Sequence, residues 1–267
     1  MIYLKPKTVE EMLKNVDENR EFFIFCGGTD LTLKLKNGDV SGVVDISSLD
    51  EFNHITIEKN ILKIGALTTI NTILEDENIK EHLPILHEAS KEFASHQIRN
   101  IATIGGNIAN DSPVADMIAP LLVLESSVTL LSVDGERTIP LDELFDGFKS
   151  LTIKNKVITS INIPLKNRQS YYRKVGARAK LNISKLSLAM VKTEDNFYLS
   201  GASLNHYIKR FFNVEKLLES GEFSSEIIFE TLKKDISPSG SFRSTKEYRF
   251  KVLVNMIEEG LVEFNKR

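Results

Sequence analysis

Short apolar runs separated by polar or glycine-containing turns dominate the first part of the chain. Thr8 and Glu11 form a capping box, which predicts a helix that continues to about Asn19. Runs of consecutive apolar residues predict strands, and longer stretches with helical spacing predict helices. On this basis we expect strands at 22–25 (a buried one), 43–46, 55–57, 61–64, 128–133, 137–139 and 157–163, and helices at 31–36, 69–93 with a break at Pro84, and 114–124.

The pattern changes in the last third of the chain. The polar stretch from Pro164 to Ser170 predicts a domain boundary, so we expect one domain over 1–165 and a second over 166–267. In the second part strands precede helices, which indicates an α+β arrangement rather than repeated βαβ units. The expected strands are 171–176, 186–192 and 197–204, and the expected helices are 209–219, 224–234 and 244–265.

Composition narrows the class of protein. The 267 residues are 42% hydrophobic and 27% charged, as in ordinary soluble globular proteins, and the net charge of -3 argues against nucleic acid as a partner. The single cysteine, Cys26, excludes an intrachain disulfide and a four-thiolate iron–sulfur cluster. No signal peptide or membrane-spanning run is evident, so we expect a cytoplasmic protein with no membrane insertion.

Two glycine-centred segments carry the candidate chemistry. Cys26-Gly27-Gly28-Thr29-Asp30 ends an apolar run, and Thr29 or Asp30 is expected to cap the helix that follows. The segment 102–107, with Gly105-Gly106 between Thr103 and Asn107, lies in a stretch with little helical signal. Glycine lets a ligand approach the backbone closely, and exposed N–H groups in such turns attract anions. The two segments are therefore candidate walls of one anion site.

Competing interpretations remain open at this point. No two glycines are two residues apart, so the dinucleotide fingerprint G-x-G-x-x-G is absent, and the P-loop signature is absent too. The first segment alone is equally compatible with a simple strand-to-helix turn. Asp116 could bind ribose hydroxyls or could begin the next helix. Cys26 could be a redox-sensitive thiol, although we expect a small buried hydrophobic residue.

A resemblance to a known family removes part of this ambiguity. The run 93–108, with Ser112-Pro113 and Asp116, resembles the FAD-binding signature of the molybdenum hydroxylase flavoproteins. These are medium subunits or middle domains of xanthine dehydrogenase and carbon monoxide dehydrogenase type enzymes. The first glycine segment is similar to the family's Ala-Gly-Gly-Thr-Asp loop, with Cys26 in place of Ala. Further similar stretches are Gly65-Ala66 with Thr68-Thr69, Lys174–Arg178, 186–192, Ser237-Pro238, Arg243-Ser244 and Tyr248-Arg249.

The resemblance implies an α+β, vanillyl-alcohol-oxidase-like (PCMH-type) fold. Two α+β subdomains, about 1–55 and 56–165, would hold an extended, non-covalent FAD, and a C-terminal α+β domain with an antiparallel sheet would cover one side. Residues 25–31 would wrap the pyrophosphate, and 103–107 would line the phosphates and the ribityl chain. The implied FAD site comprises Phe25, Cys26, Gly27, Gly28, Thr29, Asp30, Leu31, Phe93, Ala102, Thr103, Ile104, Gly105, Gly106, Asn107, Asp116, Ile158 and Lys174.

Some of these roles have simpler alternatives. In the family Asp116 would hold ribose hydroxyls, and Ile158 and Lys174 would lie near the flavin, where a cation favours the anionic reduced form. Lys174 could equally be a solvated lysine at a strand end, and Phe93, which approaches adenine or flavin in the family, could be a core residue.

The resemblance also implies a function. The chain would be the FAD subunit of an oxidoreductase complex, with iron–sulfur clusters on a small partner subunit and molybdopterin on a large one. Electrons would pass from the clusters through FAD to NAD+ or another acceptor, with no catalytic side chain and no metal on this chain. The alternatives are a stand-alone FAD-dependent oxidoreductase of the same fold and a non-catalytic nucleotide-binding assembly module.

Overall fold

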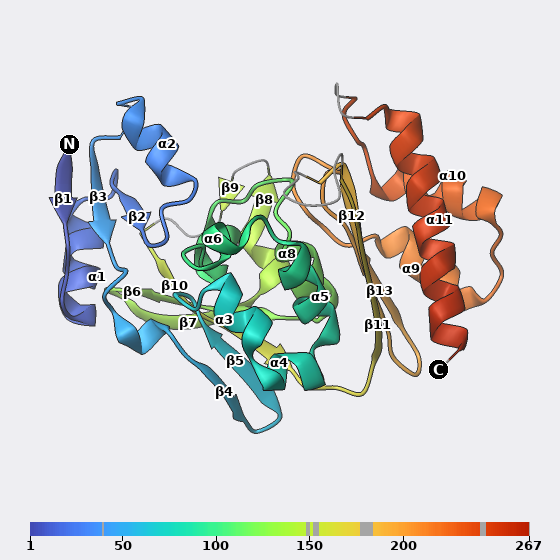
Figure 1. Cartoon of the computed structure of the whole chain (residues 1–267), viewed down its shortest axis with the longest axis horizontal. Coiled ribbons are helices and arrows are strands. Elements are labelled where there is room, and N and C mark those ends of the chain that lie inside the picture. The colour runs from blue at the N-terminus through green and yellow to red at the C-terminus, as the bar shows by residue number, and fades with distance from the viewer. Residues whose placement is uncertain (39, 148–149, 152–154, 177–183, 241–243, 267) are drawn as a thin grey trace.

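The computed structural model consists of three groups of helices and strands that lie side by side (Figure 1). A small N-terminal lobe adjoins a central five-stranded sheet with its helices, and a three-stranded sheet covered by long helices lies at the C-terminal end. The class is α+β, as the sequence predicts. The residues that the structure describes are 1–38, 40–147, 150–151, 155–176, 184–240 and 244–266.

The helices are mostly short in the first two thirds of the chain and longer at the end. This difference follows from the frequent glycines, prolines and polar turn residues before residue 165. Their bounds are α1 Val9–Glu18, α2 Leu31–Lys36, α3 Ile70–Glu75, α4 Glu77–His82, α5 Pro84–Glu92, α6 His96–Arg99, α7 Ile104–Ala109, α8 Ile118–Val123, α9 Phe212–Ser220, α10 Ser225–Asp235 and α11 Lys246–Asn265, with short 3₁₀ turns η1 Asp50–Phe52 and η2 Leu141–Leu144.

The strands form separate sheets within the described part of the chain. The first sheet, in the order β1-β3-β2, is parallel, whereas the sheets β4-β5-β10-β6-β7 and β11-β12-β13 and the pair β8-β9 are antiparallel. Their bounds are β1 Ile2–Leu4, β2 Phe23–Phe25, β3 Gly42–Asp45, β4 Ile55–Glu58, β5 Ile61–Gly65, β6 Ser127–Ser132, β7 Gly135–Pro140, β8 Phe145–Gly147, β9 Ser150–Leu151, β10 Val157–Pro164, β11 Gln169–Val175, β12 Leu186–Lys192 and β13 Phe197–Ser200.

The N-cap at Thr8 and the Pro84 break are confirmed, whereas the return bond of the predicted capping box goes to the amide before the N-cap. Thr8 Oγ1 accepts a hydrogen bond from the Glu11 amide at 3.2 Å, and the Glu11 carboxylate accepts one from the Lys7 amide at 2.8 Å. Pro84 begins α5, where a missing N–H costs nothing because the first turn has no intrahelical acceptor. A second break, which the pattern did not predict, occurs at Asp76, whose carboxylate caps α4 by accepting from the Ile79 amide.

Several other predictions need correction. Strand β2 is only partly buried, and the Phe23 side chain is exposed, because β2 lies at the edge of its sheet. Asp30 occupies the N-cap of α2, but no side chain caps that helix. The helix predicted over 114–124 begins only at Ile118. The stretch with Gly105-Gly106 is helical: α7 contains both glycines. Strand β1, which the pattern did not predict, pairs with β3.

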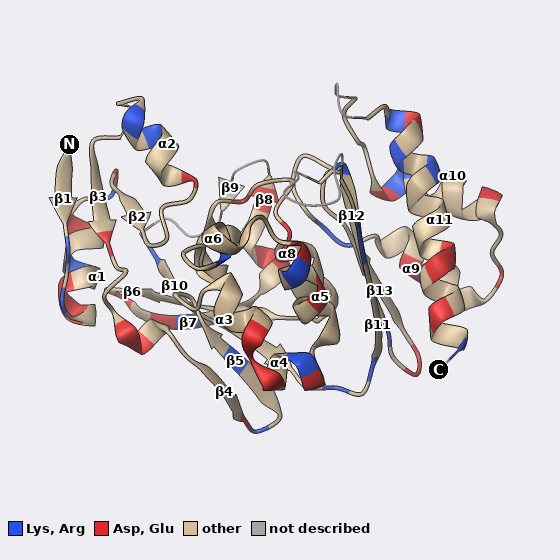
Figure 2. Ribbon diagram, viewed as in Figure 1, with Lys and Arg blue, Asp and Glu red and all other residues tan. Residues whose placement is uncertain are grey.

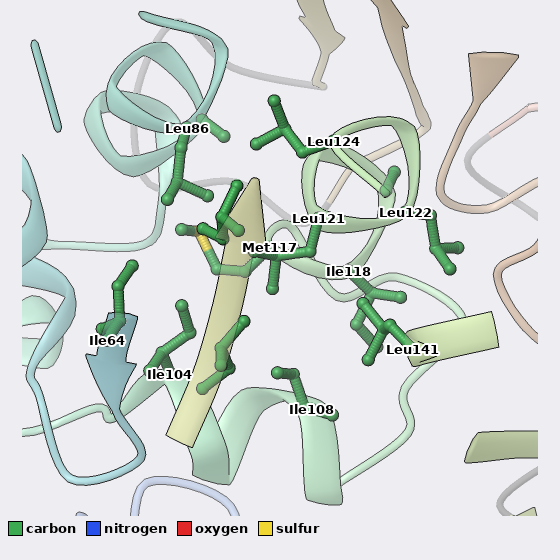
Figure 3. Packing of buried hydrophobic residues seen from close by; sticks show 14 of the residues in the cluster. Ile64, Leu86, Ile104, Ile108, Met117, Ile118, Leu121, Leu122, Leu124 and Leu141 are labelled. Atoms are coloured by element: carbon green, nitrogen blue, oxygen red, sulfur yellow. The ribbon is translucent and has the colours of Figure 1, made fainter. Parts of the chain in front are cut away.

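The main core joins the central sheet to the C-terminal sheet. Apolar side chains of α5, α7 and α8 pack over β5, β6 and β10. Figure 3 shows Leu86, Ile104 and Ile108 from these helices near Ile64 of β5. Ala189, Val191, Ala202 and Ile208, beyond the predicted boundary, belong to the same cluster. The apolar core is therefore continuous across the predicted domain boundary at residue 165, and that boundary stays a prediction.

The C-terminal sheet lies between two sets of helices. Helices α5 and α8 contact one side of it, and α11 contacts β11 and β12 from the other. A second apolar cluster, which includes Phe211, Leu232 and Ile257, fills the space under α9, α10 and α11. The expected antiparallel sheet with helices is thus present. The similar stretches at Ala177-Arg178 and at Arg243 lie outside the described residues.

Candidate functional site

A cleft of about 440 Å³ lies between the N-terminal lobe and the central sheet, and both glycine segments line it. This volume is within the range typical of small-molecule sites. The lining residues that the sequence predicted for the FAD site are Phe25, Cys26, Gly27, Gly28, Thr29, Asp30, Leu31, Phe93, Ala102, Thr103, Gly105, Gly106, Asn107 and Ile158.

The two glycine segments touch each other, although they lie far apart in the sequence. A Cβ built at Gly27 would lie 1.9 Å from the carbonyl oxygen of Ile101, so only glycine fits between the segments. Beside this contact, Cys26 Sγ and Thr103 Oγ1 form a hydrogen bond of 3.2 Å. The segments therefore build one wall of the cleft jointly. Cys26 is partly exposed at this wall rather than a buried core residue.

The first segment presents unused hydrogen-bond donors to the cleft. Among the described residues, no protein group accepts from the backbone N–H groups of Gly27–Leu31. Gly28 has φ +65°, which breaks the strand direction, and a Cβ there would also meet the Phe25 ring at 2.6 Å. Consecutive N–H groups around a left-handed residue form the concave arrangement that binds anions.

The second segment presents a different chemistry. The amides of Ile104 and Gly105 donate to the carbonyl groups of Thr68 and Ala66, and the Gly106 amide donates to Thr103 Oγ1 at 3.1 Å. The expectation of free backbone N–H groups here is therefore wrong, because the Thr68 and Ala66 carbonyl groups and the Thr103 cap accept from them. The segment instead offers Asn107 Oδ1, a buried oxygen that has no hydrogen-bond partner in the described structure.

Ile104 does not line the cleft. Its side chain is fully buried and points into the main core with Ile108 (Figure 3). Gly105 explains this orientation, since a Cβ at that position would lie 2.6 Å from the Ala66 Cβ. Helix α7 thus turns its apolar side to the core and its glycine side to the cleft.

Asp116 and Lys174 meet each other rather than lining the cleft. Lys174 Nζ donates to Asp116 Oδ2 and to the Glu92 carbonyl oxygen, at 2.8 Å and 2.9 Å. Both side chains are nearly inaccessible, so Lys174 is not a solvated lysine. Burial raises the pKa of Asp116 above its ordinary value, and the Lys174 ammonium opposes this shift. Asp116 Oδ1 is buried and has no hydrogen-bond partner among the residues that the structure describes.

The sequence missed part of the lining. Two signals in the sequence could have identified some of these residues. Lys34 follows Leu31 by about one helical turn, and Lys156 and Val157 immediately precede Ile158 in the sequence. The lining residues that were not predicted are Phe23, Ile24, Lys34, Ile46, Ala66, Leu67, Ala109, Asn110, Asp111, Leu151, Lys156 and Val157.

The donor set suits an anionic organic ligand better than a metal. Among the described residues, no group of three or more His, Cys, Asp or Glu side chains is arranged to hold a metal ion. The unused N–H groups beside Gly28 suit phosphate oxygens, and Asn107 Oδ1 can accept from a hydroxyl or imide N–H group. No helix in the described structure is long and apolar enough to span a membrane.

Comparisons with known proteins agree with this chemistry. Residues 1–166 match the family model described as the FAD binding domain in molybdopterin dehydrogenase. The glyceraldehyde dehydrogenase medium chain of Sulfolobus acidocaldarius is 29% identical, covering 94% of this chain and 93% of the relative. The nicotinate dehydrogenase FAD-subunit of Eubacterium barkeri is 32% identical, covering 86% and 83%.

The fold also matches that of solved structures. A chain of carbon monoxide dehydrogenase from Hydrogenophaga pseudoflava superposes with a TM-score of 0.89 and 24% identity, covering 98% of this chain and 96% of that one. The PCMH-type fold that the resemblance implied is thereby confirmed. The chain belongs to the family of FAD-binding domains of the molybdopterin dehydrogenases, which are oxidoreductases.

Proposed function

We propose that this chain is the FAD-carrying electron-transfer subunit of a molybdenum hydroxylase complex. The observation that carries the proposal is the lining of the cleft, which contains both the N–H groups of Gly27–Leu31 and the buried Asn107 Oδ1, all without a partner among the described residues. FAD carries both a pyrophosphate, which such amides bind, and hydroxyl and ring N–H groups, which need acceptors. The residues present therefore fit FAD.

The chain's own residues would bind and orient the cofactor. Amides of Gly27–Leu31 would hold the pyrophosphate, and Asn107 with the glycine surface of α7 would line the adjoining part of the ligand. Phe93 and Ile158 would exclude water with their apolar side chains. Asp116 and Lys174 do not line the cleft, so they would contact the ribose or the flavin only where the bound cofactor extends to the junction of the central and C-terminal sheets. When bound, FAD supplies the redox chemistry, accepting single electrons and releasing a pair.

The partners follow from what this chain lacks in its sequence. One cysteine cannot bind an iron–sulfur cluster, so in the proposed complex the clusters belong to a small subunit and molybdopterin to a large one. The names of relatives as medium chain and FAD-subunit support such an assembly. In the complex, the electrons would pass from FAD to NAD+ or to another acceptor. We place the assembly in the cytoplasm, in keeping with the low cysteine content.

The proposal is tested by cofactor binding followed by partner capture. The purified chain, reconstituted with FAD and desalted, should show the flavin absorption bands and should co-purify with an iron–sulfur protein from its native host. Absence of the bands after reconstitution contradicts the proposal. Turnover by the isolated holoprotein without any partner would favour a stand-alone oxidoreductase. Bound FAD that no reduced partner or NADH can reduce would favour an assembly module.

Thr103→Ala should weaken FAD binding roughly 5-fold, which corresponds to about 1 kcal/mol. The substitution removes the N-cap of α7 and the hydrogen bond to Cys26, and so loosens the joint wall. A lost cap also costs about 1 kcal/mol of stability. Thr8→Ala is the matched control, because it removes the cap of α1 away from the cleft. Both variants should lower the melting temperature, and equal FAD affinities in fluorescence titrations would contradict the assigned role.

A further inference from the structure

Two lysines line the cleft beside the first glycine segment. Lys34 lies on α2, and Lys156 immediately precedes β10, so the two cations come from different lobes. Figure 2 shows the basic residues of α2 on the N-terminal lobe. The lining of the cleft therefore includes positive side chains from two lobes together with the N–H groups of Gly27–Leu31.

Neither lysine has an anionic partner in the described structure. Asp30 and Asp111 also line the cleft, yet no carboxylate oxygen of a described residue lies within 4.0 Å of Lys34 or Lys156. Lys34 Nζ instead lies 5.0 Å from the centre of the Phe23 ring. Lys34 is exposed and Lys156 is partly buried, so the Lys34 ammonium group at least is open to a ligand in the cleft.

We propose that Lys34 and Lys156 bind the pyrophosphate of the dinucleotide from two sides and neutralise its charge. This inference rests on the proposed function and extends it to side chains that neither glycine segment contains. Backbone amides carry only partial charges, whereas a pyrophosphate carries about two negative charges at neutral pH. Two ammonium groups supply the missing charge, and charged hydrogen bonds are stronger than neutral ones.

The test measures FAD affinity and its dependence on salt. Lys34→Gln, Lys156→Gln and the double variant are compared with Lys36→Gln, which removes a charge from the same helix outside the cleft. We expect each cleft variant to weaken FAD binding about 5-fold at low ionic strength and the double variant about 25-fold, with less than a 2-fold change for Lys36→Gln. The difference should shrink at 0.5 M salt, since screening weakens exposed charge pairs.

The possible outcomes separate this inference from the proposed function. A wild-type protein that binds no FAD contradicts the proposed function itself. A wild-type protein that binds FAD, with a double variant whose Kd and salt dependence equal those of Lys36→Gln, contradicts only the role of the lysines. Melting temperatures of the apo variants check folding, and an effect on affinity that persists unchanged at high salt would also overturn the electrostatic role.

Discussion

Gly27→Ala should reduce FAD affinity by about 100-fold or more, equivalent to nearly 3 kcal/mol. The new Cβ would lie 1.9 Å from the Ile101 carbonyl oxygen, and a backbone atom cannot move aside as a flexible side chain can. The two glycine segments must then separate, which widens the wall of the cleft and displaces the amides of Gly27–Leu31. Overpacking of this kind also costs about 1–3 kcal/mol of stability.

The matched control for this substitution is Gly240→Ala. A Cβ at Gly240, which is exposed, meets no described residue within 4 Å, so this variant should keep both its melting temperature and its FAD affinity. Isothermal titration of the apo proteins with FAD measures the affinities directly. A Gly27→Ala protein that binds FAD as tightly as Gly240→Ala would show that contact between the segments does not shape the site.

Lys174→Met should destabilise the fold by about 3 kcal/mol, or roughly 6–12 °C in melting temperature. The lysine connects β11 with Asp116 and with the Glu92 carbonyl group at the end of α5, so it ties the C-terminal sheet to the central part of the chain. Its removal leaves the Asp116 carboxylate buried, with neither oxygen paired to a described residue. An unpaired buried charge costs more than the intact pair contributes.

The pH dependence gives this prediction a specific sign. Burial already raises the pKa of Asp116, and loss of the opposing Lys174 charge raises it further above the unfolded value. The folded variant then binds a proton more readily than the unfolded chain, so its stability rises as the pH falls through this raised pKa. Relative to wild type, the deficit should be largest at neutral pH and smaller in acid.

Two comparisons make the result decisive. Asp116→Leu combined with Lys174→Met removes both charges and should recover most of the lost stability, since neither partner is then left alone. Lys63→Met, on the exposed side of β5, should change the melting temperature little. A double variant as unstable as Lys174→Met, or a deficit that grows on acidification, would contradict the role of the buried pair.

Local sequence signals predicted most elements because each depends on a few neighbouring residues. The helix N-cap at Thr8, Pro84 at the start of α5 and the strand runs needed no information from distant parts of the chain. The same reasoning failed for α7. Its two glycines have low helix propensity, and the need for glycine at position 105 comes from a close approach to Ala66, which is distant in the sequence. Family resemblance supplied the fold and the oxidoreductase class, both confirmed by the comparisons.

By itself, the sequence determined the α+β class, the family and the two glycine segments that line the cleft. Only the tertiary structure decided which donors remain available: among the described residues, the amides of Gly27–Leu31 have no acceptor, whereas those of Ile104 and Gly105 donate to Thr68 and Ala66. It also paired Asp116 with Lys174 across 58 positions of the chain and brought Lys34 and Lys156 into the lining of one cleft. Local propensity encodes where the chain turns, but the pairing of polar groups depends on which distant segments the folded core brings into contact.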